Sequence, residues 1–186
     1  STLAAAVSAR LEANGFTVLA VIGMPELKEI PLGALAPLLA STGSPPTEPT
    51  SEQLHRLFSL ASRAGVKQVL VVDDGPMLDE VSASTVYQLV RVYGMRCVMT
   101  ARTEHPFTAP LLRLRDEGFV ETTEMPAMST ANAGGIVQRA LGSRVEPQSL
   151  RAITELAGGN PLFLRGLVLA ATQANAVAPG ENGLVV

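Results

Sequence analysis

Residues 69–74 read VLVVDD, four apolar residues followed by two acidic ones. With the two residues before them, they have the length and unbroken apolar centre of a strand that is buried on both faces. Asp73 and Asp74 then lie at the carboxyl end of the strand, where open α/β sheets bind their ligands. One carboxylate there can hold Mg²⁺, and the next can orient an attacking water molecule. Because Gly-Pro follows Asp74, the stretch is equally typical of a plain strand that ends in a turn.

Outward from this strand, the chain alternates apolar runs with segments of helical periodicity as far as residue 125. Strands are predicted over Phe16–Ile22, Lys67–Asp73, Met95–Thr100 and Phe119–Thr123, and helices over residues 2–14, 31–40 and 50–64, near Ser84–Tyr93 and from Pro110. Thr50 and Gln53 predict a capping box for the third of these helices. The alternation predicts a parallel sheet with right-handed crossovers and helices on both faces.

After Met125 the pattern becomes helical only, with helices predicted over Thr130–Leu141, Pro147–Ala157 and Pro161–Ala174. The last two begin with Pro, which is favoured at the first position of a helix. We therefore predict an α/β core over residues 1–125, a helical lid over residues 126–178 and a tail over residues 179–186.

Composition excludes several classes of protein. Apolar residues make up 47% of the 186 residues and charged residues 17%, so the chain can form a full core. The net charge of −3 is unfavourable for a domain that itself binds the phosphates of DNA. A lone cysteine, Cys97, excludes an internal disulfide or a multi-cysteine metal site. With neither a signal peptide nor an apolar run of ~20 residues, the sequence predicts a cytoplasmic protein without membrane contact.

Three further segments carry polar groups that could act with the acid pair. Ser1 and Thr2 open a helix, as does the hydroxyl residue that binds Mg²⁺ in a phosphate-binding loop, although an ordinary helix cap is the simpler interpretation. Arg102 follows the Met95–Thr100 strand, where a cation could sense a γ-phosphate or simply be solvated. Residues 158–161 read GGNP, and they are also fully explained as a junction between two helices.

Together these motifs resemble the STAND/AAA-type P-loop ATPase domain of large LuxR-family transcriptional regulators of the actinobacterial type. The resemblance runs over almost the whole chain. It rests on VLVVDD at residues 69–74, VMTAR at 98–102, LLRLRDEGFVE at 111–121 and LAGGNPLFLRGLV at 156–168. It implies a three-layer P-loop NTPase fold with a helical lid, and ATP or ADP with Mg²⁺ as cofactors.

The resemblance also implies roles for individual residues. Ser1 and Asp73 would bind Mg²⁺, Thr2 would lie beside the α- and β-phosphates, and Asp74 would activate water. Arg102 would act as the sensor of the γ-phosphate, and Asn160 and Pro161 in the lid would contact the nucleotide. The parent protein is then a low-turnover ATPase switch that self-associates and binds DNA through a helix-turn-helix domain outside this chain.

The chain departs from the family at its start, because the first strand and the glycines and lysine of the Walker A loop do not precede Ser1. We expect the 186 residues alone to bind ATP poorly and to be inactive. A receiver domain is disfavoured, because only one predicted strand lies between Asp74 and Thr100 and no phosphorylatable Asp ends a strand there. A non-catalytic nucleotide-binding or interaction scaffold remains the alternative function.

Overall fold

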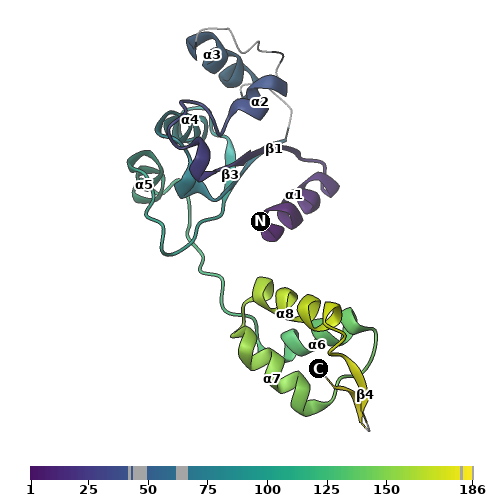
Figure 1. The fold of residues 1–186 in the computed structure, drawn as a ribbon. Coiled ribbons are helices and arrows are strands. Elements are labelled where there is room, and N and C mark those ends of the chain that lie inside the picture. The colour runs from purple at the N-terminus through teal and green to yellow at the C-terminus, as the bar shows by residue number, and fades with distance from the viewer. Residues whose placement is uncertain (42, 44–49, 62–66, 181, 186) are drawn as a thin grey trace. The chain divides into compact units, whose positions relative to one another are not determined.

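The computed structural model describes residues 1–41, 43, 50–61, 67–180 and 182–185. It divides into two compact units, Ser1–Thr122 and Thr123–Val186 (Figure 1). The predicted fold class, a parallel α/β sheet with helices, is confirmed. Within the described residues, no helix is long and apolar enough to cross a membrane.

The first unit contains the sheet. Its helices and strands are α1 (Thr2–Ala13), β1 (Thr17–Ile22), the 3₁₀ helix η1 (Pro25–Leu27), α2 (Ala36–Ser41), α3 (Thr50–Ala61), β2 (Gln68–Asp73), the 3₁₀ helix η2 (Gly75–Met77), α4 (Glu80–Arg91), β3 (Arg96–Met99) and α5 (Ala109–Asp116). The predicted strands Phe16–Ile22, Lys67–Asp73 and Met95–Thr100 are each found within one or two residues of their expected ends. The predicted capping box falls on Thr50, whose side chain lies outside the described part of the structure.

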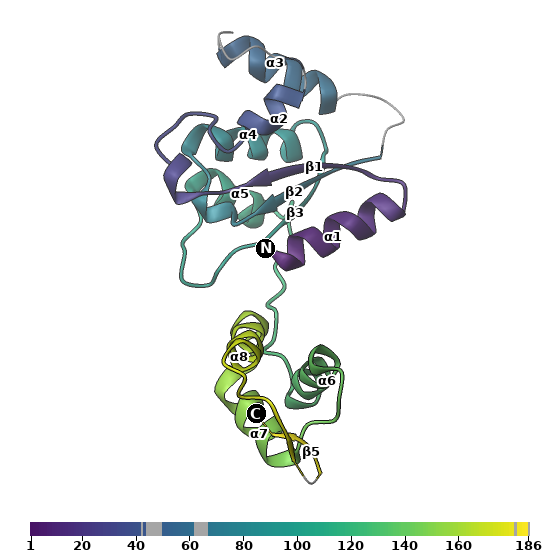
Figure 2. The same ribbon diagram turned by 45° about the vertical axis from the view of Figure 1, so that its right-hand side comes forward.

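The three strands are parallel in the order β1-β2-β3, so the strand that carries the acid pair is the central one. Its side chains alternate between two cores, because successive strand residues point to opposite faces. Val69 and Val71 pack with Ala4 of α1, whereas Leu70 and Val72 belong to a larger core. Figure 2 shows α1 on one face of the sheet and α4 and α5 on the other. The first unit therefore has the three layers that the sequence predicts.

The predicted fourth strand, Phe119–Thr123, is wrong. These residues follow α5 and do not join the sheet. The backbone N–H groups of Phe119 and Val120 donate instead to the carbonyl of Leu114, at 2.8 and 3.3 Å, and so close the end of α5. The guanidinium carbon of Arg91 also lies over the ring of Phe119, 5.9 Å from the ring centroid. The β-branched and aromatic residues that suggested a strand are used here to end a helix.

The helix predicted near Ser84–Tyr93 begins earlier, at Glu80. Asp79 is its N-cap, and its carboxylate accepts a hydrogen bond from the backbone N–H of Ser82 at 2.8 Å. The short helix predicted over residues 31–40 is likewise displaced, and α2 covers Ala36–Ser41. The periodicity locates α4, and its exact first residue depends on the Asp79 cap.

The second unit is built from α6 (Thr130–Leu141), α7 (Pro147–Ala157) and α8 (Pro161–Gln173), as Figure 1 shows. Their shared core includes Val137, Ile153 and Leu164. The residues expected as a tail include a small antiparallel hairpin, β4 (Ala178–Gly180) with β5 (Gly183–Val185). Leu184 of this hairpin packs against the helical core, and the backbone N–H of Glu146 donates to its carbonyl at 2.8 Å.

Gly159, between α7 and α8, is required both by its backbone and by its neighbours. It has φ +77, and a Cβ placed there would lie 2.8 Å from Ala127 Cβ and 2.9 Å from the Met128 carbonyl oxygen. We expect Gly159→Ala to destabilise the second unit by about 2–3 kcal/mol, through backbone strain and steric overlap. Gly158→Ala is the matched control: Gly158 has φ +55 but open space around it, so we expect about 1 kcal/mol. Urea unfolding followed by circular dichroism measures both, and equal losses would contradict this expectation.

Candidate functional site

The acid pair lies at the carboxyl edge of the sheet, where the neighbouring strand β3 brings the Thr100 hydroxyl beside it. Asp73 is the last residue of β2 and is buried, at 5% exposure. Thr100 directly follows β3, and its backbone N–H donates to the Val72 carbonyl at 2.9 Å. Because the strands are parallel, their carboxyl ends meet at this edge. The sheet topology therefore places Asp73, Asp74 and Thr100 together.

The carboxylate of Asp73 accepts hydrogen bonds from two hydroxyl groups. Ser1 Oγ donates to Asp73 Oδ1 at 2.8 Å, and Thr100 Oγ1 donates to the same oxygen at 2.5 Å. The backbone nitrogen of Ser1 lies against the other carboxylate oxygen. Ser1 Oγ also accepts a hydrogen bond from the Ala4 N–H at 3.3 Å, so Ser1 is the N-cap of α1 as well. The start of α1 is thereby joined to the end of β2.

The backbone of Asp74 adopts a left-handed conformation, with φ 53 and ψ 53. The Asp74 N–H donates to Thr100 Oγ1 at 3.0 Å, and the next N–H, that of Gly75, donates to the Thr100 carbonyl at 2.9 Å. The Asp74 carboxylate lies 3.6 Å from Arg102 Nε, at a partly exposed position. Non-glycine residues seldom adopt this backbone conformation, and where they do it is often at functional sites. The two neighbouring carboxylates therefore face different partners.

Gly23, just after β1, allows this arrangement because it passes close to Asp74. A Cβ at Gly23 would lie 2.2 Å from the backbone oxygen of Asp74. The Gly23 N–H donates to the Asp73 carbonyl at 2.8 Å. A larger residue at position 23 would therefore displace the turn that carries Asp74.

The donor set around Asp73 fits Mg²⁺ that arrives with a phosphate ligand. Mg²⁺ prefers oxygen ligands, keeps several waters and is usually held by one or two protein groups together with substrate phosphates. Ser1 Oγ and the Asp73 carboxylate supply such oxygens side by side. In the part of the chain that the structure describes, no group of three or more His, Cys, Asp or Glu side chains could hold a metal ion.

The remaining predicted site residues are Thr2, Asn160 and Pro161. Thr2 is the first residue of α1 and is exposed. Asn160 and Pro161 lie in the second unit, where Asn160 Oδ1 accepts hydrogen bonds from the N–H groups of Leu162 and Phe163 at 3.0 and 3.2 Å. The structural interpretation of the GGNP segment, a junction between helices, is thus confirmed.

Asp79 is an important residue near the site that motif reasoning did not single out as functional. Asp79 is 2% exposed, and its carboxylate accepts hydrogen bonds from the N–H groups of Leu32 and Ala34, at 3.0 and 3.3 Å, besides capping α4. Leu32 is itself left-handed, with φ 61. Asp79 therefore fixes the segment between β1 and α2 to the turn that follows the acid pair. An Asp just before a helix is an N-cap signal, and it could have been recognised in the sequence.

Cys97 lies in β3, and burial raises the pKa of its thiol to about 12. The thiolate is the reactive form, so a pKa far above that of a free cysteine leaves very little of it at pH 8. We expect iodoacetamide to label Cys97 in the folded chain at pH 8 at least about tenfold more slowly than in the chain unfolded in urea. Mass spectrometry of timed samples gives both rates. Equal rates would show that the thiol is accessible and activated.

No protein-family model matches the chain, and no curated protein matches it. Several solved structures do match. One structure of a Thermotoga maritima RuvB variant has a TM-score of 0.57 at 14% identity, and another RuvB structure from the same organism, described as a Holliday junction branch migration motor, has 0.56 at 14% identity. Each comparison covers 92% of this chain and 50% of the RuvB chain, so the chain spans about half the length of these structures. Over most of its length, this chain therefore shares the fold of these RuvB structures.

Proposed function

We propose that the chain is the nucleotide-binding part of an ATP-dependent regulatory switch. The observation that supports this most strongly is the contact between Ser1 Oγ, at the start of α1, and the buried carboxylate of Asp73. In P-loop NTPases a hydroxyl residue that opens a helix and an Asp that ends a strand share one Mg²⁺. The fold shared with RuvB supports the same proposal.

In this proposal each group at the sheet edge has a distinct role. Ser1 and Asp73 would hold Mg²⁺, which would supply positive charge to offset that of the ATP phosphates. Thr2 and the other first amides of α1 face the phosphates, because helix N-termini bind anions. Asp74 orients the attacking water and accepts its proton, and Arg102 interacts with the γ-phosphate.

The proposal extends to the parent protein through the sequence resemblance. A cytoplasmic LuxR-type transcriptional regulator would use the nucleotide state of this part to change its conformation or self-association. DNA would be bound by a helix-turn-helix domain outside these 186 residues. The motifs at residues 69–74 and 156–168 support this extension.

The test measures ATP binding by calorimetry in two proteins, the 186-residue chain and a version extended upstream as its gene encodes. We expect Mg²⁺-dependent ATP binding and slow turnover in the extended protein, and weak binding or none in the shorter one. Binding without turnover would favour the nucleotide-binding scaffold. If the extended protein is folded and shows no affinity for ATP, the switch proposal is wrong.

A further inference from the structure

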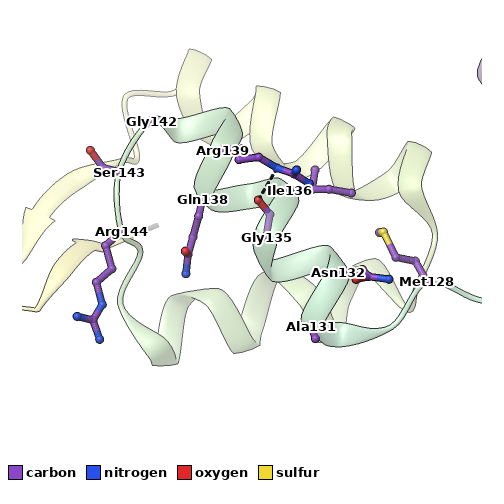
Figure 3. Close-up of a pocket in the computed structure, with 10 residues that line it drawn as sticks. All are labelled: Met128, Ala131, Asn132, Gly135, Ile136, Gln138, Arg139, Gly142, Ser143 and Arg144. Atoms are coloured by element: carbon purple, nitrogen blue, oxygen red, sulfur yellow. Dashed lines mark hydrogen bonds between the residues drawn. The ribbon is translucent and has the colours of Figure 1, made fainter.

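An open groove of about 1090 Å³ runs along α6 in the second unit (Figure 3). We call it the α6 groove, and the lining residues used below are Met128, Gly135, Ile136, Gln138, Arg139 and Arg144. Its lining extends along α6 from residue 131 to 139 and continues through Gly142 to residue 144. At ~1.5 Å per helical residue this is roughly 15 Å, long enough for about five residues of extended peptide at ~3.3 Å each.

Gly135 lies on the floor of the groove, and packing within the unit does not explain it. Glycine weakens the interior of a helix because it has the largest backbone freedom to lose. Its neighbour Gly134 is needed for packing, since a Cβ there would lie 3.3 Å from Leu150 Cδ2. A Cβ at Gly135 would meet nothing within 4 Å. The missing side chain at residue 135 keeps the groove open and lets a ligand approach the backbone of α6.

The groove is positively charged. Arg139 and Arg144 line it, and its lining includes no carboxylate. Within the described residues, neither arginine forms an ion pair. The acid nearest to Arg144 in sequence, Glu146, accepts a hydrogen bond from the Asn182 N–H at 3.4 Å. Arg139 Nε donates to the Gly135 carbonyl at 3.1 Å, which holds the guanidinium over the floor, as Figure 3 shows.

The surroundings of the two arginines favour one class of anion. Met128 and Ile136 add apolar surface to the same groove, and Gln138 adds an amide. Residues 123–186 contain four Arg, four Glu and no Lys or Asp, so this unit is neutral. A neutral unit lacks the broad basic face that nucleic acids require. A peptide with carboxylates beside an apolar side chain matches both the charge and the apolar surface.

We propose that the α6 groove binds an extended acidic peptide segment of a partner protein. Its carboxylates pair with Arg139 and Arg144, its apolar side chain packs on Ile136 and Met128, and its backbone passes over Gly135. This proposal does not rest on the nucleotide site that we propose for the first unit. It gives the second unit a partner-binding surface of its own.

The experiment uses fluorescence anisotropy with the full 186-residue chain and fluorescein-labelled hexapeptides of Glu and Leu, in which two Glu are separated by one, two or three residues. Matched peptides with Lys in place of Glu and a ten-nucleotide oligothymidine are the comparison probes. The variants are Arg139→Gln with Arg144→Gln, Gly135→Leu, and Arg165→Gln as a charge control outside the groove. The melting temperature of each variant is measured alongside.

We expect at least one acidic peptide to bind, and the double arginine variant to bind it about tenfold more weakly or worse. Gly135→Leu should lose binding while its melting temperature stays the same or rises, because Leu is the better helix former. Arg165→Gln should bind like the unchanged chain. If no acidic peptide binds, if Arg165→Gln weakens binding as much as the groove variants do, or if the oligothymidine binds the groove more tightly, the proposal is overturned.

Discussion

Replacing Asp79 by alanine is expected to lower the free energy of unfolding of the first unit by about 3–5 kcal/mol. The substitution removes the cap of α4, worth ~1 kcal/mol, and leaves the buried N–H groups of Leu32 and Ala34 without an acceptor, at ~1–3 kcal/mol each. Since small domains are stable by only about 5–15 kcal/mol, a loss of this size is a large fraction of the stability of the unit. Urea unfolding followed by circular dichroism measures the loss.

Two neighbouring substitutions separate this effect from general damage to the core. Asp79→Asn keeps one acceptor oxygen for Leu32 and Ser82 but turns an amide donor toward the Ala34 N–H, so we expect about half the loss. Ser82→Ala should be neutral or stabilising by up to ~1 kcal/mol, because Ser82 Oγ is buried without a hydrogen-bond partner among the described residues. If Asp79→Ala costs no more than Ser82→Ala, the hydrogen bonds of Asp79 do not hold the segment between β1 and α2.

The second large effect concerns turnover in the upstream-extended protein. We expect Asp74→Asn to slow ATP hydrolysis by about 100-fold or more, because an amide cannot accept the proton of the attacking water. Asn is nearly isosteric with Asp and tolerates the left-handed backbone of residue 74, so ATP affinity and melting temperature should change little. Phosphate release under saturating ATP measures the rate.

Arg102→Gln provides the comparison. It removes the cation that lies 3.6 Å from the Asp74 carboxylate, and it leaves that carboxylate able to accept a proton. We expect a smaller loss of turnover than for Asp74→Asn. If Asp74→Asn hydrolyses ATP at the original rate, Asp74 has no part in the chemistry, and a different base must be sought.

The sequence predicted the arrangement of the sheet better than the ends of its elements. Unbroken apolar runs mark β2 because it is buried on both faces, and parallel order then brings Thr100 beside Asp73. The error at Phe119–Thr123 arose because β-forming residues can also close a helix by packing and hydrogen bonding. Whether such residues form a strand or close a helix depends on tertiary contacts, which cannot be read from local propensity.

The details of the site were less predictable for the same reason. The acid pair, Ser1 and Arg102 could be selected from motifs. The different partners of the Asp73 and Asp74 carboxylates depend on tertiary contacts, those of Asp73 with Ser1 and Thr100 and that of Asp74 with Arg102. The close approach of Gly23 joins residues that are distant in sequence, as do the contacts of Asp79 with Leu32 and Ala34. No sequence motif predicts the α6 groove, because the groove depends on residue 135 being a glycine, which has no side chain.

The most direct test of the proposed nucleotide site is the Mg²⁺ dependence of ATP affinity in the upstream-extended protein, measured by calorimetry with and without Asp73→Asn. We predict that Mg²⁺ strengthens ATP binding at least about tenfold in the unchanged protein, through the oxygens of Ser1 and Asp73. Asp73→Asn should remove this increase and leave the affinity for metal-free ATP unchanged. An Asp73→Asn variant that is folded and keeps the full Mg²⁺-dependent increase would contradict the assignment of Asp73 as the metal ligand.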